Sequence, residues 1–183
     1  MTDVKFEDFL LKKSKVKQGV VEIEYSLNVK TNGSIRHPLI TDKIEMPHPD
    51  LIASIDAFHE TLMQSWGMKT DDQELGESVT VTGVDVSGKD DLKGLIITGK
   101  KAVTSGAVAM NSPRIRFNGS AFGFEEQVET FFGIHVTEVF KALYDNKSAQ
   151  LTLFGEAPEG ELPLGEDPPE ENIQIAEVGK RKK

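Results

Sequence analysis

Residues 20–30, in which apolar and polar side chains alternate, constrain the fold more than any other part of this chain. Their apolar members would lie on one side of a strand and their polar members on the other, as in an antiparallel sheet with one wet face. Asn32-Gly33 follows, and this dipeptide favours a two-residue hairpin turn because both of its positions tolerate positive φ. We therefore predict a hairpin whose return strand runs through Ile35–Met46, with Pro38 placing that strand at an edge or a bulge.

Two apolar stripes at helical spacing predict two helices. The first covers about residues 50–66, where Leu51, Ile55, Phe58, Leu62 and Trp66 share one face. The second covers about 123–145 and has acidic residues in its first turn, which suits the positive end of the helix dipole. Gly133 lies inside it, and we expect a close packing contact there. Residues 68–77 between the helices are expected to form an acidic loop.

The remaining strands are predicted at Val79–Val86, Leu92–Ala102 and Val108–Phe117. Pro113 interrupts the third, so we expect its second half to be the better strand and to lie at an edge. If residues 6–16 add a strand, each half of the chain consists of three strands and a helix, which suggests a duplicated β-β-(β)-α unit. The predicted class is α+β, with an antiparallel sheet of about five to seven strands backed by two helices.

Composition divides the chain into a globular domain, residues 1–154, and a tail, residues 155–183. The tail is rich in proline, glycine and acids and ends in four basic residues, so we expect it to be disordered. The chain has no cysteine, which excludes disulfides and thiolate metal sites and fits a reducing compartment. The N-terminal residues mix acids with apolar side chains, unlike a signal peptide, so a cytoplasmic location is expected.

The net charge of −9 argues against broad wrapping of duplex DNA. A local basic groove is still compatible with it. Lys100 and Lys101, together with Arg114 and Arg116 on one face of a strand, could contact single-stranded DNA, with Tyr25 or Phe122 available for base stacking. The alternative, an ordinary strand with a wet basic face, is favoured. The cluster Lys12, Lys13, Lys15 and Lys17 is likewise interpreted as a solvated strand or loop.

No catalytic motif is found, so we expect a protein that is not an enzyme and that needs no cofactor. The helical pairs Asp56 with His59 and His135 with Glu138 have a spacing that occurs in metal sites, but the further carboxylates of such sites are missing. We therefore predict no metal site. His135 lies on an apolar stripe, and a satisfied, half-buried histidine is the expected role.

Residues Gln150–Phe154 resemble the short peptide with which bacterial polymerases and repair proteins dock on the replication sliding clamp. Gln150, Leu151, Leu153 and Phe154 match that pattern, and Thr152 stands at its tolerant position. The resemblance covers five residues of 183. It implies that the glutamine hydrogen-bonds at the rim of a clamp pocket while Leu153 and Phe154 fill its apolar base. The alternative is a final strand at 149–154, since Leu151 and Leu153 also alternate with polar residues.

These features together favour a non-enzymatic accessory protein of DNA replication, recombination or repair that binds single-stranded DNA, a replisome protein such as the clamp, or both. The acidic tail is similar in composition to tails of bacterial and phage single-stranded-DNA-binding proteins, but it ends in bases where theirs end in acids. An origin in a phage or mobile element fits the lack of a recognisable housekeeping family. The alternative is a protein-interaction or assembly module, such as a phage structural or inhibitory protein, without nucleic-acid binding.

Overall fold

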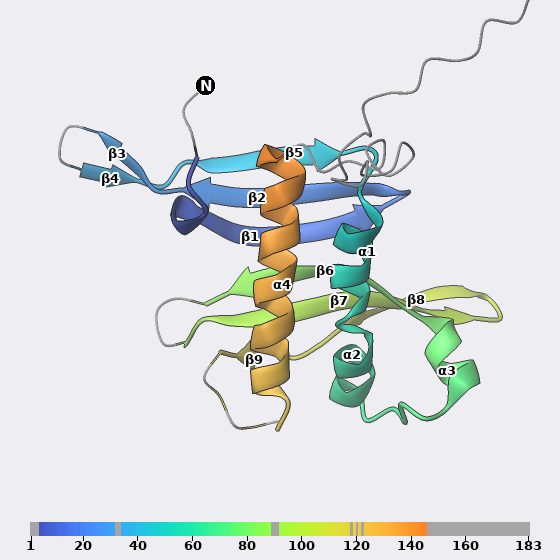
Figure 1. Cartoon of the computed structure of the whole chain (residues 1–183). Coiled ribbons are helices and arrows are strands. Elements are labelled where there is room, and N and C mark those ends of the chain that lie inside the picture. Colours follow the sequence, from blue (N-terminus) through green and yellow to red (C-terminus); the bar gives the residue numbers. More distant parts are fainter. Residues whose placement is uncertain are drawn as a thin grey trace, which may run out of the picture.

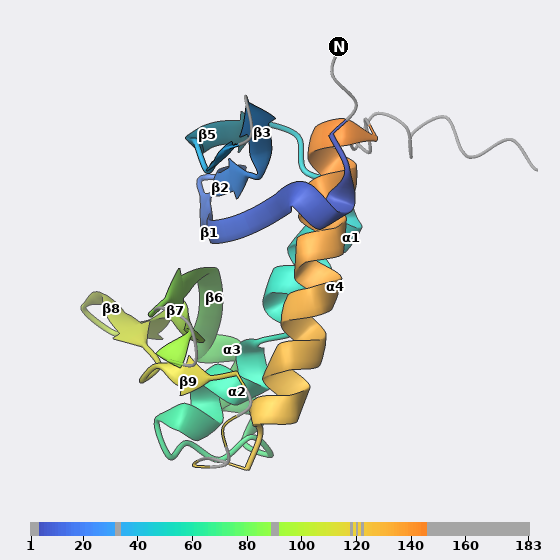
Figure 2. The same ribbon diagram turned by 90° about the vertical axis from the view of Figure 1, so that its left-hand side faces the viewer.

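The computed structural model describes residues 4–31, 34–88, 92–117, 119, 121 and 123–145. It is an α+β fold in which one antiparallel sheet carries helices on a single face, as predicted (Figures 1 and 2). Within the described residues, no helix covers the other face of the sheet, which is here called the open face. The predicted final strand at 149–154 and the predicted tail lie outside the described residues.

The strands of the main sheet are β1 Phe9–Lys17, β2 Val20–Leu27, β5 Leu39–Ile44, β6 Val79–Ser87, β7 Gly94–Val103, β8 Gly106–Asn111 and β9 Ile115–Arg116. A separate two-stranded ribbon consists of β3 Val29–Thr31 and β4 Ser34–Arg36. The helices are the 3-10 turn η1 Phe6–Asp8, then α1 Pro49–Asp56, α2 His59–Ser65, α3 Gln73–Ser78 and α4 Glu125–Tyr144.

The sheet order β5-β2-β1-β6-β7-β8 is symmetric about its centre. The first half contributes β1, β2 and β5, followed by α1 to α3. The second contributes β6, β7 and β8 with the short β9, followed by α4, so the predicted duplicated organisation is present as a topology. The halves join through β1 and β6, which pair over only three positions, Lys13 with Asp85 through Lys15 with Gly83. An added Cβ at Gly83 would collide with the backbone of Ser14 and Lys15, so glycine is what lets the two halves approach here.

The pairing of residues between the strands confirms the predicted hairpin. Tyr25 pairs with Ile40 in β2–β5, and Lys30 pairs with Ile35 in β3–β4, so both ladders continue one pairing. Pro38 lies in the gap between β4 and β5, and β5 is an edge strand, as its proline predicted. Asn32 and Gly33, predicted to form the turn, lie outside the described residues.

The predicted strand Val108–Phe117 is divided at Pro113 into β8 and β9, which lie one after the other along β7. Ser112 bridges the division: its backbone N–H donates to the Ile97 carbonyl (2.8 Å), and its hydroxyl accepts from the Ile97 N–H (2.9 Å). The first half is the longer strand and the free edge, so the expectation that the second half would be the better strand was wrong. The side-chain hydroxyl replaces a carbonyl and keeps the ladder intact ahead of the proline.

The predicted helix 50–66 is two helices. The Phe58 N–H bonds to the carbonyl three residues back (3.2 Å), and α2 begins at His59. The break turns Phe58 fully into the core, edge-on to Phe131 of α4. Part of the predicted loop 68–77 belongs to α3, whose N-cap Asp72 accepts from the Leu75 N–H (3.0 Å). This N-cap acid was a start signal that the loop prediction overlooked.

Helix α4 spans the sheet and matches its prediction. Its residues Val128, His135 and Val139 are buried, and Phe140 packs edge-on against Phe9 of β1. Gly133 is exposed, and an added Cβ there would meet nothing within 4 Å, so the expected packing contact was wrong.

Candidate nucleic-acid interface

Acidic and basic side chains are segregated between the two sides of the molecule. The helical segments, residues 49–78 and α4, contain only two bases, Lys69 and Lys141, against eleven acids. These acids are Asp50, Asp56, Glu60, Asp71, Asp72, Glu74, Glu77, Glu125, Glu126, Glu129 and Glu138. These helical segments therefore carry much of the negative charge of the folded part, and of their acids Glu77, at the end of α3, lines a hollow of the open face.

The open face of the sheet has the opposite balance. The residues of the open face are identified from the strand pairing, because two residues that pair across neighbouring strands point to the same face. Val21, Ile23 and Tyr25 are buried and define the core face. Among the described strand residues, three acids lie on the open face: Glu22, Glu24 and Asp85. Seven bases lie there: Lys12, Lys13, Lys15, Lys17, Lys43, Lys100 and Arg116.

Each of the three acids on this face lies within 4.0 Å of one of two lysines. Lys43 contacts Glu22 (3.1 Å), and Lys13 lies 4.0 Å from Glu24 and 3.9 Å from Asp85. Lys43 lowers the pKa of Glu22 by hydrogen bonding and charge, and Lys17 and Lys15 lower it further from a greater distance. Within the described residues, no carboxylate lies within 4.0 Å of the other five bases: Lys12, Lys15, Lys17, Lys100 and Arg116.

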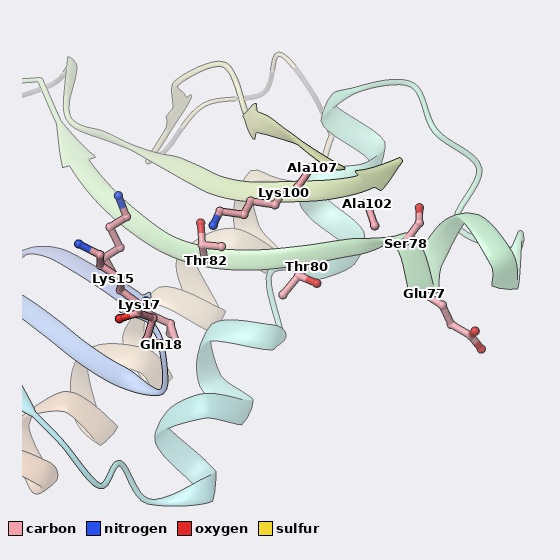
Figure 3. A pocket seen from close by; sticks show the side chains of 11 residues that line it. Lys15, Lys17, Gln18, Glu77, Ser78, Thr80, Thr82, Lys100, Ala102 and Ala107 are labelled. Carbon is pink, nitrogen blue, oxygen red and sulfur yellow. The ribbon is translucent and has the colours of Figure 1, made fainter. Parts of the chain in front are cut away.

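A hollow of about 580 Å³ lies where β1 and β6 part on this face. Lys15 and Lys17 of β1 lie on one side of Thr80 and Thr82, and Lys100 of β7 lies on the other (Figure 3). Ala107 of β8 and the end of α3, with Glu77, complete the rim. Three lysines, two threonines and one acid are thus among the residues that line this space. Such a site suits an anion with several oxygens.

A second hollow of about 360 Å³ lies further along the same face, lined by Leu10, Lys12, Ser26, His37 and Leu39. The Ser26 hydroxyl is buried and has no hydrogen-bond partner within the described residues. Both hollows are therefore next to lysines of β1.

The four residues predicted to contact nucleic acid do not form one group. Lys100 pairs with Thr80 and lies on the open face, but Lys101 pairs with the buried Val79 and lies on the helical face. Arg116 pairs with Gly94 on the open face, six residues along β7 from Lys100, a distance of about 20 Å. Arg114 is exposed in the loop before β9, beside Gly88.

The lysines of β1 complete the interface, although the sequence interpretation treated them as ordinary solvated residues. Lys13, Lys15 and Lys17 alternate along the strand, which is the signal that places them on one face. Lys12 joins them because the register with β2 shifts between Leu11 and Lys13. This bulge could not be located from the alternation alone.

The aromatic side chains of the described residues lie on the helical side. Tyr25, suggested for base stacking, is buried, and its hydroxyl donates to Asp42 (2.8 Å) while accepting from Tyr144 (2.9 Å). Burial and these two hydrogen bonds raise the pKa of Tyr25. Tyr25 therefore cannot stack on a base at the open face, and Phe122 lies outside the described residues.

Both histidines of the considered metal pairs have protein partners. The His59 ring shares a hydrogen bond with the Gly76 carbonyl (3.0 Å), and the His135 ring shares one with the Ser54 hydroxyl (2.8 Å). His135 is fully buried rather than half-buried, and its Nε2 has no partner among the described residues. In that part of the chain, no three metal-ligating side chains gather at one point.

The peptide Gln150–Phe154 lies outside the described residues, so its two interpretations are unchanged. Comparison of the chain with protein-family models, curated proteins and solved structures finds no match. No helix in the described ranges has the length and apolar character needed to cross a membrane.

Proposed function

We propose that this protein is a cytoplasmic, non-enzymatic accessory of DNA replication, recombination or repair, which binds single-stranded DNA through its phosphates on the open face of the sheet. The observation that carries the proposal is the segregation of charge: in a chain of net charge −9, five open-face bases have no carboxylate within 4.0 Å among the described residues. Phosphate binding needs basic side chains that gather on one face and are not neutralised by neighbouring carboxylates.

The shape of the open face favours single-stranded DNA over duplex DNA. Lys15 and Lys17 approach the hollow from one side and Lys100 from the other, so a single phosphate backbone could be contacted from both sides. A duplex would instead need a longer row of bases matching its two backbones. Because the described aromatic side chains lie on the opposite side, contacts to bases would contribute little, and binding would depend weakly on sequence.

Titration of a labelled oligothymidylate, followed by fluorescence anisotropy at several salt concentrations, tests this function. With three to five phosphates contacted, log K should fall with log salt with a slope of about −2 to −3.5. The triple variant Lys15→Gln/Lys17→Gln/Lys100→Gln should bind at least about tenfold more weakly, with a slope smaller by roughly 2. Lys5→Gln/Lys69→Gln/Lys141→Gln makes the same change in net charge away from the open face and should bind like the wild type. Equal affinities of the two triple variants, or binding that ignores salt, would refute the proposal.

The clamp-like peptide supplies a second, separable part of this function. Gln150, Leu151, Leu153 and Phe154 match the docking pattern, and a bacterial sliding clamp is the partner we propose for them. A pull-down with a clamp should recover the wild type and lose Leu153→Ala/Phe154→Ala. The variant Leu162→Ala/Leu164→Ala changes two apolar residues further along the chain and should be recovered normally. Equal recovery of all three proteins would exclude the clamp.

The alternative function, a protein-interaction or assembly module without nucleic-acid binding, also has an observation in its favour. The edge strand β8 is uncharged and exposed from Gly106 to Ala109. A protein that fails the oligonucleotide titration but associates through this edge would fit the alternative.

A further inference from the structure

The β8 edge of the sheet lacks the usual protection of a free edge. From Ala102 to Pro113 the sequence contains no charged residue, although 28% of the whole chain is charged. Val108, at the middle of β8, is 51% exposed. The opposite edge strand, β5, carries Asp42 and Lys43 and follows Pro38. Charges and prolines at an edge hinder pairing with another strand, so of β5 and β8, the outer strands of the described sheet order, β8 is the one open to it.

The direction of the β8 backbone groups follows from one hydrogen bond. The Ser112 N–H donates to the Ile97 carbonyl, so these two residues form a hydrogen-bonded pair of the antiparallel ladder. Such pairs alternate along the ladder, so Met110, Val108 and Gly106 also direct their N–H and C=O groups toward β7. Ala107, Ala109 and Asn111 direct theirs outward. Trp66 agrees with this assignment, since its indole Nε1–H reaches the Asn111 carbonyl from outside the ladder (3.1 Å).

Four outward backbone groups are therefore available at the centre of the strand, the N–H and C=O of Ala107 and of Ala109. Neither residue has another hydrogen bond within the described part of the chain. The next carbonyl, that of Asn111, is already bound by Trp66. An incoming strand can thus gain up to four backbone hydrogen bonds without displacing a contact among the described residues.

We propose that two copies of this chain associate by pairing β8 with β8 of the second copy, antiparallel, about a two-fold axis at Val108. Ala107 of each copy then faces Ala109 of the other, and these two pairs use all four outward groups. A register centred on Ala109 would instead pair Ala107 with Asn111, whose carbonyl already accepts from Trp66, so two of its six backbone bonds would have to displace that contact. The self-complementary strand matches the isologous geometry of a two-fold dimer.

The absence of charge along β8 permits a second copy as the partner. Two chains of net charge −9 repel one another over most of their surfaces, but this seam brings no charged side chain of either β8 to the other. At its centre the two Val108 side chains meet on the helical face in a non-hydrogen-bonded pair, where Cα atoms lie about 4.5 Å apart. The contact buries the exposed valine of each copy, and aliphatic cross-strand pairs of this kind stabilise sheets.

The dimer would extend the open face across the seam. Because paired strands share their faces, the open faces of both copies lie on the same side of one continuous sheet. Ala107 lines the basic hollow, so the two hollows flank the seam, and the two Lys100 positions come within about 15 Å of each other. This consequence rests on the proposed function, whereas the pairing itself does not.

The test is the oligomeric state of the full chain without nucleic acid, measured by light scattering and sedimentation equilibrium. We expect the wild type to approach twice its 20.2 kDa mass as its concentration rises. Val108→Glu should raise the dimer dissociation constant more than about tenfold, because two carboxylates then face each other across the seam. Within one chain the new carboxylate faces Lys101, its cross-strand partner, so the monomer should fold normally. Ile35→Glu introduces the same charge at an exposed position of β4 and should dimerise like the wild type.

Two further variants keep the test decisive. Ala109→Pro removes an outward N–H but no bond to β7, and should also give a folded monomer. Mixing Val108→Glu with Val108→Lys should restore a dimer that contains one copy of each. A wild type that stays monomeric at high concentration, or a Val108→Glu variant that dimerises like the wild type, would overturn the proposal. A monomer whose Ala107 and Ala109 amides are protected from exchange would also overturn it, since the edge would then be covered by the chain itself. None of these outcomes bears on DNA binding.

Discussion

At the scale of single residues, His135 links folding to pH. Ser54 donates its hydroxyl hydrogen to the Leu51 carbonyl (2.7 Å), so its oxygen can only accept from His135, which assigns the ring proton to Nδ1. Nε2 is buried without a partner in the described part of the chain, and protonating it would place an unpaired cation in the core. Burial accordingly lowers the pKa of His135 to about 4.

This pKa predicts a loss of stability in acid. Between the unfolded value of 6.5 and about 4, the unfolded chain binds a proton at this position and the folded chain does not. The stability that neutral, buried His135 contributes to the fold is therefore complete above about pH 6.5. It is lost as the pH falls toward 4, by about 3 kcal/mol in all. Denaturant unfolding measured across this range should show a smaller pH slope for His135→Leu than for the wild type. The exposed His37→Asn should keep the wild-type slope, and a variant His135→Leu with an unchanged slope would contradict the assignment.

The hydroxyl chain of Tyr144, Tyr25 and Asp42 ties the end of α4 to β2 and β5. Tyr25→Phe keeps the ring packed against Phe9 but leaves the Asp42 carboxylate and the Tyr144 hydroxyl without this partner. We expect a loss of about 1–3 kcal/mol in the free energy of unfolding, because one of the two hydrogen bonds has a carboxylate acceptor. Chemical denaturation measures it. Affinity for single-stranded DNA should not change, since Tyr25 is buried on the helical side, and a selective loss of DNA binding would show that the residue is exposed to ligand.

At the scale of elements, the joint between β1 and β6 depends on Gly83. Gly83→Ala would force the added methyl into the backbone of Ser14 and Lys15, and we expect a destabilisation of about 1–3 kcal/mol or more. Gly133→Ala is the matched control, since it lies exposed in α4 with open space around it and should stabilise by about 1 kcal/mol. Thermal unfolding of both variants measures the difference in sign. Destabilisation by the two substitutions alike would mean that the joint is not close-packed.

Most elements were predictable because their signals are local. The alternation around Ile23, the turn signal before Ser34 and the helical stripe of α4 each specify an element within one window of sequence. The break at Phe58 was not predictable, since the apolar spacing is the same for one helix as for two, and the packing of Phe58 against Phe131 decides it. The face occupied by Lys101 was likewise set by a partner, Val79, that is distant in sequence.

At the scale of the whole molecule, the sequence allows a local basic groove within an acidic chain, and the fold shows on which surface the bases gather. The net charge argued against broad wrapping of duplex DNA, but eleven acids lie in the helical segments and seven bases lie on the open face of the sheet. Of these acids, Glu77 at the end of α3 lines the basic hollow. This segregation depends on which side of each strand faces the helices, and the bulge after Leu11 and the pairing of β1 with β6 help to determine it. The candidate interface was therefore only partly predictable: Lys100 and Arg116 were identified, whereas the lysines of β1 were not.

Segregated charge predicts behaviour on ion exchangers that a uniform charge of −9 would not produce. At neutral pH and low salt, the protein should bind an anion exchanger through its helical side and also be retained on a sulfated polysaccharide matrix through its open face, because surface charges act over about a Debye length. Lys15→Gln/Lys17→Gln/Lys100→Gln should lose retention on the polysaccharide and bind the anion exchanger more tightly. Lys5→Gln/Lys69→Gln/Lys141→Gln has the same net charge but should still be retained on the polysaccharide, because its substitutions leave the open-face lysines intact. If both triple variants eluted together from both matrices, net charge alone would govern binding, and the open face would have no role as a basic surface.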